Sequence, residues 1–364
     1  MPKVNNSKKV AAPKTEKVLP EELQATIASL NKKFGNNAVT VGVPADHVEI
    51  QRIPTGSLTL DIALGGGIPV GRFIEIAGNE SSTKTTQTCH IIRNAQKLGY
   101  IVAFADVENT SDERYFKQLG VDTSNLIYMR PDSTEEATES LLQLQKSGAT
   151  LLVLDSIASM VPNKESESKM DETVRMGIPQ QLLGEFLRKF QANNNRLERE
   201  GKTPATLICL NQLRQKIGGY GDPEYAPGGM AKKFMASVFM LLRRGDWISE
   251  GTAERKKIVG QVVKFKIEKN KTYKRMQTGE FDFYFADNKA GVHRLYNDNI
   301  SEVIALAVEW DVIQRKGAWF YYKDQKYQGL EKAVEDLSSR PEVMEEIKQQ
   351  VLELATAVSW DGEE

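Results

Sequence analysis

The chain has 364 residues, of which 27% are charged, and a formal net charge of −1 at pH 7. This length suits one large domain with appendages, or two domains. The near-zero charge argues against a protein whose whole surface binds nucleic acid, so any nucleic-acid site must be a local patch.

The first 45 residues are predicted to form a disordered basic tail and one helix. Residues 1–19 contain five lysines against Glu16 alone and no apolar signal-peptide core. After Pro20, the segment EELQATIASLNKKFG repeats apolar residues at helical spacing, and Gly35 follows as a stop. Such a short helix cannot bury its apolar stripe alone. Its own domain is the default docking site, and a neighbouring subunit is the alternative.

Residues 46–290 alternate between apolar runs and helix-length segments. The apolar runs are RFIEIAG, YIVAFAD, LLVLD, TLICLNQ and VFMLLRR, with helix-length segments at Lys84–Leu98 and Glu135–Ser147 among them. This pattern predicts an α/β core with a mostly parallel central sheet covered on both faces. The next run, VVKFKIEK, alternates apolar and charged residues and suits a half-exposed strand.

Residues 291–364 are predicted to form a small α+β C-terminal domain with a short acidic tail. A helix is expected around Ile300–Trp310, a hairpin in AWFYYKDQKY, and a last helix ending near Val358. The two cysteines, Cys89 and Cys209, lie far apart in apolar contexts and favour a reducing compartment. No run reaches the roughly 18 to 20 apolar residues of a membrane span. We therefore expect a soluble cytoplasmic protein with no membrane partner.

A phosphate-binding loop is predicted where the strand RFIEIA meets the helix at Lys84. The loop comprises Gly78, Asn79, Glu80, Ser81, Ser82, Thr83, Lys84, Thr85 and Thr86. In such loops successive backbone N–H groups cradle phosphate oxygens. Lys84 would neutralise the β and γ phosphates of a nucleotide, and Thr85 would offer its hydroxyl oxygen to Mg²⁺. The alternative is a Ser/Thr-rich helix cap without a ligand.

Thr83 departs from the usual pattern, which has glycine before the lysine. If this position requires a positive φ, a β-branched residue costs on the order of 1 to 3 kcal/mol of strain. If its dihedral angles are near helical values, Thr83 simply starts the helix. The backbone donors and Lys84 survive in both cases, so we expect nucleotide binding to persist, while the rate of hydrolysis stays open.

Polar residues stand at the carboxyl ends of several predicted strands. Asp155 ends LLVLD, Glu108 follows YIVAFAD, and Asn211 and Gln212 end TLICLNQ. In a parallel sheet these ends open on the same edge as the phosphate loop. Asp155 suits a metal-orienting carboxylate, Glu108 a base that polarises water, and Gln212 a contact to the γ-phosphate. A helix cap, a turn residue and a surface polar group are the respective alternatives.

Several segments together resemble one family. These are TGSLTLDIALGGGIPVGRFIEIAGNESSTKTT, ADVENTSDERYFKQLGVD, LLVLDSIASMVP, LNQLRQKIG and PGGMAKKFMASV. They are similar to RecA-type homologous recombinases of bacteria and phages, from about residue 20 to the C-terminal region. The resemblance implies a RecA-like P-loop ATPase core, ATP and Mg²⁺ as cofactors, and a DNA-dependent ATPase. It also implies helical filaments on single-stranded DNA that pair with homologous double-stranded DNA and exchange strands.

The resemblance also assigns roles to single residues. Asp112 and Tyr115 match residues that contact and stack on the adenine, although Tyr115 also suits an ordinary half-buried helix aromatic. Lys269 and Lys271 match a pair that reaches across a subunit interface to the neighbour's γ-phosphate. Gln212 would couple the γ-phosphate to the DNA loops.

Two segments are candidate DNA loops, roughly 163–177 and about 213–229. The second is rich in glycine and carries basic and tyrosine side chains, which suits single strands of any sequence. The predicted DNA-binding residues are Arg175, Met176, Gly177, Arg188, Arg214, Lys216, Ile217, Gly218, Tyr220, Gly228 and Gly229. Gln181 stands where the family usually has arginine, which should reduce the salt slope of DNA binding by about one.

Residues 255–275 add a basic face, with nine Lys or Arg against Glu268, for DNA, a neighbouring subunit or solubility. Three other functions compete with the recombinase: a helicase or hexameric motor, a filament former that hardly hydrolyses ATP, and a small-molecule phosphotransferase. The short helix near residues 20–34, the retained Glu108 and the loop at 213–229 argue against them in turn.

Overall fold

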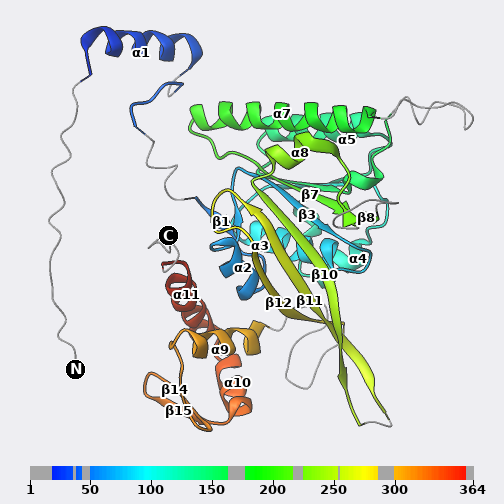
Figure 1. Ribbon diagram of the computed structural model, residues 1–364, viewed down its shortest axis with the longest axis vertical. Coiled ribbons are helices and arrows are strands. Elements are labelled where there is room, and N and C mark those ends of the chain that lie inside the picture. Colours follow the sequence, from blue (N-terminus) through cyan, green and yellow to red (C-terminus); the bar gives the residue numbers. More distant parts are fainter. Residues whose placement is uncertain are drawn as a thin grey trace, which may run out of the picture.

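A central twisted sheet organises the computed structural model (Figure 1). The structure describes residues 19–35, 38–42, 50–162, 177–215, 224–252, 255–285 and 299–357. The sheet has eight strands in the order β12-β11-β10-β3-β7-β6-β4-β5. These strands are β3 (Phe73–Gly78), β4 (Val102–Asp106), β5 (Leu126–Met129), β6 (Leu151–Asp155), β7 (Thr206–Gln212), β10 (Val238–Glu250), β11 (Lys257–Asn270) and β12 (Gln277–Tyr284).

The six strands from β10 to β5 run parallel, and β11 and β12 run antiparallel to their neighbours. The prediction of a mostly parallel α/β sheet is confirmed. The five apolar runs became β3, β4, β6, β7 and β10, because strands covered on both faces need apolar side chains on both faces. The alternating run VVKFKIEK lies in β11, as expected of a half-exposed strand.

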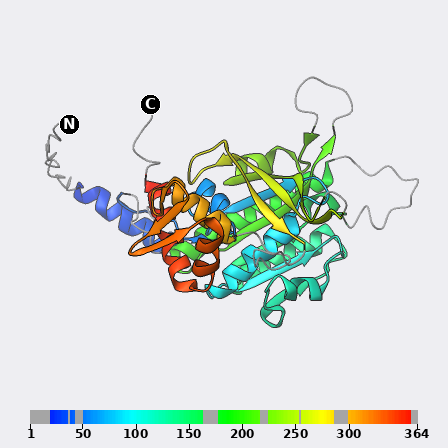
Figure 2. The same cartoon turned by 90° about the horizontal axis from the view of Figure 1, so that it is seen from below.

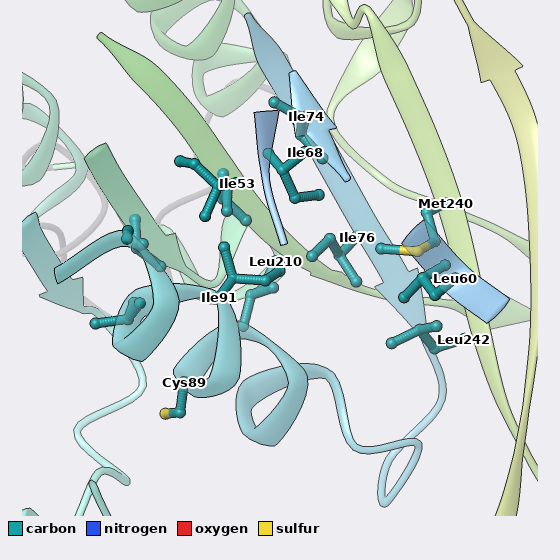
Figure 3. Packing of buried hydrophobic residues seen from close by; sticks show 14 of the residues in the cluster. Ile53, Leu60, Ile68, Ile74, Ile76, Cys89, Ile91, Leu210, Met240 and Leu242 are labelled. Carbon is teal, nitrogen blue, oxygen red and sulfur yellow. The ribbon is translucent and has the colours of Figure 1, made fainter. Parts of the chain in front are cut away.

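Helices cover both faces of this sheet and define two apolar clusters. On one face, α2 (Leu58–Leu64), α3 (Lys84–Lys97) and α4 (Glu113–Gln118) pack around side chains such as Ile76 and Ile91 (Figure 3). On the other face, α5 (Thr134–Lys146), α7 (Ile178–Arg199) and α8 (Gly229–Met235) pack around Phe186 and Phe190. Cys89 and Cys209 are buried in these clusters and are not bonded to each other.

The C-terminal region has its own apolar cluster and gathers at one end of the central sheet (Figure 2). It consists of α9 (Asn299–Glu309), the antiparallel strands β13 (Gln314–Lys316), β14 (Trp319–Tyr322) and β15 (Gln325–Gln328), then α10 (Leu330–Ser338) and α11 (Pro341–Ala357). Glu302 of α9 attaches it to the core, because its carboxylate accepts hydrogen bonds from Ser57 Oγ and from the backbone N–H of Thr59 at the start of α2.

The N-terminal helix forms as predicted, at α1 (Glu21–Phe34), and ends at Gly35 with φ 102°. None of its residues is buried, and it lies apart from the central sheet (Figure 1). Docking on its own domain, the default expectation, is therefore wrong for this structure, and its apolar stripe stays at least partly exposed along its length. Leu23 is 45% exposed and Phe34 is 54% exposed.

Two small strand pairs complete the fold. Strands β1 (Arg52–Ile53) and β2 (Ile68–Pro69) pair beside α2, and β8 (Arg214–Gln215) and β9 (Glu224–Tyr225) pair at the base of the segment predicted as the second DNA loop. Among the described residues, no helix is both long and apolar enough to cross a membrane.

Candidate functional site

The phosphate-loop sequence forms a tight turn between β3 and α3. Gly78 closes β3, where an added Cβ would meet the Leu242 carbonyl oxygen and Ser82 Oγ, so only glycine fits. Lys84 Nζ donates to the Asn79 carbonyl at 2.8 Å. Burial lowers the pKa of Lys84, while the carboxylates of Asp155 and Glu108 act in the opposite direction. The lysine therefore stands partly desolvated at the helix start, where a phosphate oxygen would be stabilised by both its charge and the helix N-terminus.

The structure decides between the two expectations for Thr83. Its backbone lies in the left-handed region, with φ 64° and ψ 18°, so Thr83 does not enter the helix with right-handed angles. Ser81 also has a positive φ, of 59°. Thr83 Oγ1 donates to the Ser82 carbonyl at 2.6 Å. The position thus requires the conformation that glycine adopts freely, and Thr83 carries strain on the order of 1 to 3 kcal/mol.

Asp155 and Thr85 form a pair of oxygen donors beside the loop. Thr85 Oγ1 donates to Asp155 Oδ2 at 3.0 Å. Burial, together with the charge of the nearby Glu108, raises the pKa of Asp155 to about 7. A buried carboxylate beside a second carboxylate is an electrostatic site for a cation, and carboxylate and hydroxyl oxygens are ligands that Mg²⁺ prefers. The donor set therefore fits the metal that the loop implies.

Glu108 and Gln212 meet at the end of the sheet, as the strand-end argument predicted. Gln212 Nε2 donates to Glu108 Oε1 at 2.9 Å. The same carboxylate oxygen accepts from Ser156 Oγ at 2.5 Å and Ser159 Oγ at 3.1 Å. Three donors fix the direction of this carboxylate, so a group that displaces the Gln212 amide also changes the orientation of Glu108.

A pocket of about 490 Å³ lies over the loop. It is lined by residues 81–86 on one side and by Thr110, Ser111, Asp112, Tyr115 and Phe116 on the other. The Tyr115 hydroxyl lies 2.6 Å from Thr86 Oγ1, and Asp112 caps α4 by accepting from the Arg114 N–H at 2.7 Å. The predicted adenine residues and the predicted phosphate residues thus share one pocket, whose polar lining fits a nucleotide.

The stem of the second loop lies directly against the phosphate loop. The Leu213 N–H donates to the Gly78 carbonyl at 3.3 Å. On the other strand of the stem, Glu224 Oε1 accepts from Asn79 Nδ2 at 2.9 Å. Arg214 is exposed and donates to the Ala158 carbonyl. Four predicted DNA contacts, Lys216, Ile217, Gly218 and Tyr220, lie outside the described residues.

Glycines mark where both loops rejoin helices. Gly228 and Gly229 have φ of 114° and 80° at the start of α8, and Gly177 has φ 108° at the start of α7. On α7, Arg188 and Gln181 are exposed. Arg175 and Met176 lie outside the described residues.

Lys269 and Lys271 lie far from this chain's own phosphate loop. In the sheet register, Lys269 stands opposite Phe239, which pairs with Glu75 near the start of β3, whereas the loop follows the end of β3. Lys271 Nζ donates to the Phe234 carbonyl at 2.8 Å, and Lys269 Nζ donates to the same carbonyl at 3.1 Å. In this structure both lysines therefore cap the C-terminal end of α8.

Comparison with known proteins gives the family. The family model described as the RecA N-terminal domain matches residues 21–290, and the model described as the RecA C-terminal domain matches residues 301–356. The chain belongs to the RecA family.

Curated relatives agree with this assignment. The chain is 41% identical over 334 residues to Protein RecA of Trichormus variabilis, which covers 91% of this chain and 88% of that protein. It is 40% identical over 352 residues to Protein RecA of Crocosphaera subtropica, covering 94% and 96%, and 39% identical over 348 residues to that of Synechococcus elongatus, covering 94% and 92%. The recombinase predicted from the sequence is confirmed at the level of the family.

Sequence reasoning missed a buried ion pair in this RecA fold. Lys232 of α8 and Glu75 of β3 are each only 1% exposed and form a salt bridge. Glu75 Oε1 also accepts from Asn211 Nδ2 at 2.8 Å, and Asn211 Nδ2 donates to the Pro227 carbonyl at 2.8 Å. The network joins α8 and the end of the second loop to the strand that precedes the phosphate loop. A glutamate inside the apolar run RFIEIAG was the available signal.

A second missed carboxylate, Asp106, supports the segment that carries Glu108. Asp106 is fully buried at the end of β4 and is the register partner of Asp155. Its Oδ2 accepts from the Tyr128 hydroxyl at 2.7 Å and from the Ser111 N–H at 3.0 Å. These bonds hold the segment between Glu108 and Asp112 in place.

Proposed function

We propose that this RecA-family chain is an ATPase whose turnover is stimulated by single-stranded DNA bound to the segment at residues 213–229. The observation that carries the proposal is the 2.9 Å hydrogen bond from Gln212 to Glu108. Gln212 is the last residue of β7, directly before the segment. A displacement of that segment moves an amide that holds the carboxylate best placed to polarise water.

The positions of the side chains support the proposed nucleotide roles. Lys84 and the loop N–H groups would bind the phosphates, Thr85 and Asp155 would hold Mg²⁺, and Tyr115 and Asp112 would position the base. The metal ion, when bound, neutralises charge that develops on the phosphate oxygens. Glu108 orients the attacking water and accepts its proton. Strain at Thr83 perturbs the turn between β3 and Lys84, so we expect the hydrolysis rate, rather than ATP binding, to be affected.

Residues at both loops support DNA as the partner. Arg214, Gly228 and Gly229 lie at the two ends of the second segment, and Arg188 is exposed on the helix that follows the first. A basic, glycine-rich and tyrosine-containing segment suits single-stranded DNA without sequence preference. Homologous pairing with double-stranded DNA and a helical homo-oligomer complete the proposal. The partly exposed apolar stripe of α1 and the position of Lys269 and Lys271 support the oligomer.

The test is ATP hydrolysis by the purified protein with and without single-stranded DNA, beside a Lys84→Ala control. Stimulated turnover that the control lacks supports a coupled recombinase ATPase. ATP-dependent DNA binding without turnover instead indicates a filament former with little hydrolysis, the alternative that the left-handed Thr83 favours. Absence of both nucleotide binding and DNA binding contradicts the proposal.

A further inference from the structure

We propose that Glu224 is a positioning residue that couples DNA occupancy of the segment at residues 213–229 to the phosphate loop through Asn79. This inference rests on the proposed function and adds a second connection to the one made by Gln212. The two connections lie on opposite sides of the segment. Gln212, the last residue of β7, precedes β8 and contacts Glu108, whereas Glu224 lies in β9 and contacts Asn79.

Asn79 makes two contacts that connect different parts of the site. Its side-chain amide donates to Glu224 Oε1 at 2.9 Å, and its backbone carbonyl accepts from Lys84 Nζ at 2.8 Å. Asn79 directly follows Gly78, whose carbonyl accepts from the N–H of Leu213, the residue before β8. The residue that anchors the phosphate-binding lysine is therefore held by the strand that leaves the DNA segment.

Glu224 is itself fixed from a second side. Arg243 Nη2 of β10 lies 2.6 Å from Glu224 Oε2, and the Glu224 side chain is 15% exposed while that of Arg243 is 47% exposed. Strand β9 pairs with β8 through Gln215 and Arg214, so the two strands of the stem move together. A shift of the stem when DNA binds would change the Asn79 contact, because hydrogen bonds weaken steeply with distance and angle.

The Asn79–Glu224 contact acts on a different group from the Gln212–Glu108 contact. Gln212 contacts the carboxylate that polarises water and therefore affects the rate of the chemical step. Glu224 acts through Asn79 on the lysine that holds phosphate and therefore affects the affinity for nucleotide. A partly exposed ion pair adds little to stability, so loss of Glu224 should change coupling without unfolding the protein.

The experiment measures the affinity of a fluorescent oligothymidylate by anisotropy, with and without a slowly hydrolysed ATP analogue and Mg²⁺. Because coupling between two ligands is reciprocal, the ratio of the two DNA affinities reports how strongly nucleotide and DNA sense each other. We expect Glu224→Ala to reduce this ratio by about fivefold to tenfold, which is within the usual range for coupled sites. Loss of a negative charge within the DNA segment can change the DNA affinity itself, but such a change affects both measurements equally and cancels in the ratio.

Matched variants isolate the contact. Glu224→Gln keeps an oxygen acceptor for Asn79 and should retain an intermediate ratio. In an Asn79→Ala background, Glu224→Ala should have no further effect, because the two changes remove one interaction. Glu353→Ala removes an exposed carboxylate on α11 and serves as the control for loss of charge.

The outcomes separate this inference from the proposed function. A normal ratio in Glu224→Ala, or full additivity with Asn79→Ala, overturns the role of Glu224 and leaves the DNA-stimulated ATPase standing. No difference between the two DNA affinities in the unchanged protein overturns the proposed function, and the inference with it. Thermal unfolding of each variant identifies any that fail to fold, in which case Glu224→Gln decides.

Discussion

At the scale of single residues, the left-handed backbone of Thr83 sets it apart from the other side chains of the phosphate loop that would contact the ligands. Lys84, Thr85 and Asp155 were identified because their side-chain types suit phosphate and Mg²⁺ at the ends of strands. The left-handed backbone at Thr83 left no signal in the sequence, since nothing in the identity of a threonine indicates a positive φ. The strain at Thr83 therefore became visible only with the fold.

Replacing Thr83 by glycine should stabilise the protein. Glycine removes strain on the order of 1 to 3 kcal/mol but loses more chain entropy on folding, at a cost of roughly 0.5 to 1 kcal/mol. We expect Thr83→Gly to raise the free energy of unfolding by about 1 kcal/mol, measured by urea denaturation without nucleotide.

The matched control makes the same substitution where the backbone is extended. Thr278 is exposed in β12 and does not have a positive φ. Thr278→Gly should lower the free energy of unfolding, because only the entropic cost applies. Loss of stability in both variants would contradict strain at Thr83.

At the scale of elements, buried parallel strands were predicted better than edge strands and short helices. The runs RFIEIAG and LLVLD are apolar because both of their faces are covered. The edge strand β5 has the partly exposed pattern of Leu126–Met129, and α8 is short and polar, with Lys232 buried by a long-range partner. Neither element shows the regular spacing of apolar residues from which a strand or a helix is predicted. Partners such as Glu75 and Glu224 come from segments more than 100 residues away.

Asp61 in helix α2 should make the free energy of unfolding depend on pH. Asp61 Oδ1 accepts from the Thr55 N–H at 2.7 Å, and burial raises the pKa of Asp61 to about 7. Glu302 acts in the same direction, whereas the Thr55 hydrogen bonds and Lys348 oppose it. The folded state thus holds this proton more tightly than the unfolded chain, whose aspartate has a pKa near 3.9.

The sign of the effect follows directly. The stabilising contribution of protonated Asp61 is fully present below about pH 4 and is lost as pH rises towards 7, by up to about 1.4 kcal/mol per pH unit. Asp61→Asn keeps an oxygen acceptor and does not titrate. We expect the variant to gain stability relative to the unchanged protein between pH 5 and about pH 8, in urea denaturation at each pH.

A constant difference between the two proteins across this range would contradict a raised pKa at Asp61. Asp122→Asn is the matched control, because Asp122 is exposed and its pKa is lowered, chiefly by the Asn125 side-chain hydrogen bond. Its contribution is present above the unfolded pKa and is lost only as pH falls through the lowered value. That variant should therefore run parallel to the unchanged protein between pH 5 and about pH 8.

At the scale of the whole molecule, several features are incomplete within one chain. Helix α1 buries none of its residues, and on α8 Phe234 is 68% exposed and Met230 is 62% exposed. Lys269 and Lys271 lie beside this face of α8. This face of α8 is separate from the nucleotide pocket, so one copy can place it against the pocket of the next copy in a head-to-tail contact. Repeated contacts of this kind build a helical filament when the rotation between successive copies does not close into a ring.

The register places these lysines beyond reach of their own phosphates. Lys269 lies two strands from β3 and about three residues before its end, which is about 10 Å across and about 10 Å along the sheet. The Nζ atoms also point to α8 rather than to the loop. If they act on a γ-phosphate, that phosphate belongs to a neighbouring copy. The double substitution of Lys269 and Lys271 by alanine should then abolish DNA-stimulated ATP hydrolysis and leave the monomer folded.

A mixture of two inactive variants distinguishes action between copies from action within one copy. Lys84→Ala keeps the lysine pair but loses its own phosphate site, and Lys269→Ala with Lys271→Ala keeps the phosphate site but loses the pair. In a filament assembled at random from equal amounts, roughly a quarter of the junctions join an intact site to an intact pair, because the interface is head-to-tail. We therefore expect the mixture to recover about a quarter of the DNA-stimulated turnover of the unchanged protein, although each variant alone has almost none. If the lysines act only within their own chain, no junction is complete and the mixture stays as inactive as its parts. Recovery must also grow with the fraction of mixed junctions, so a titration from one variant to the other should peak at equal amounts.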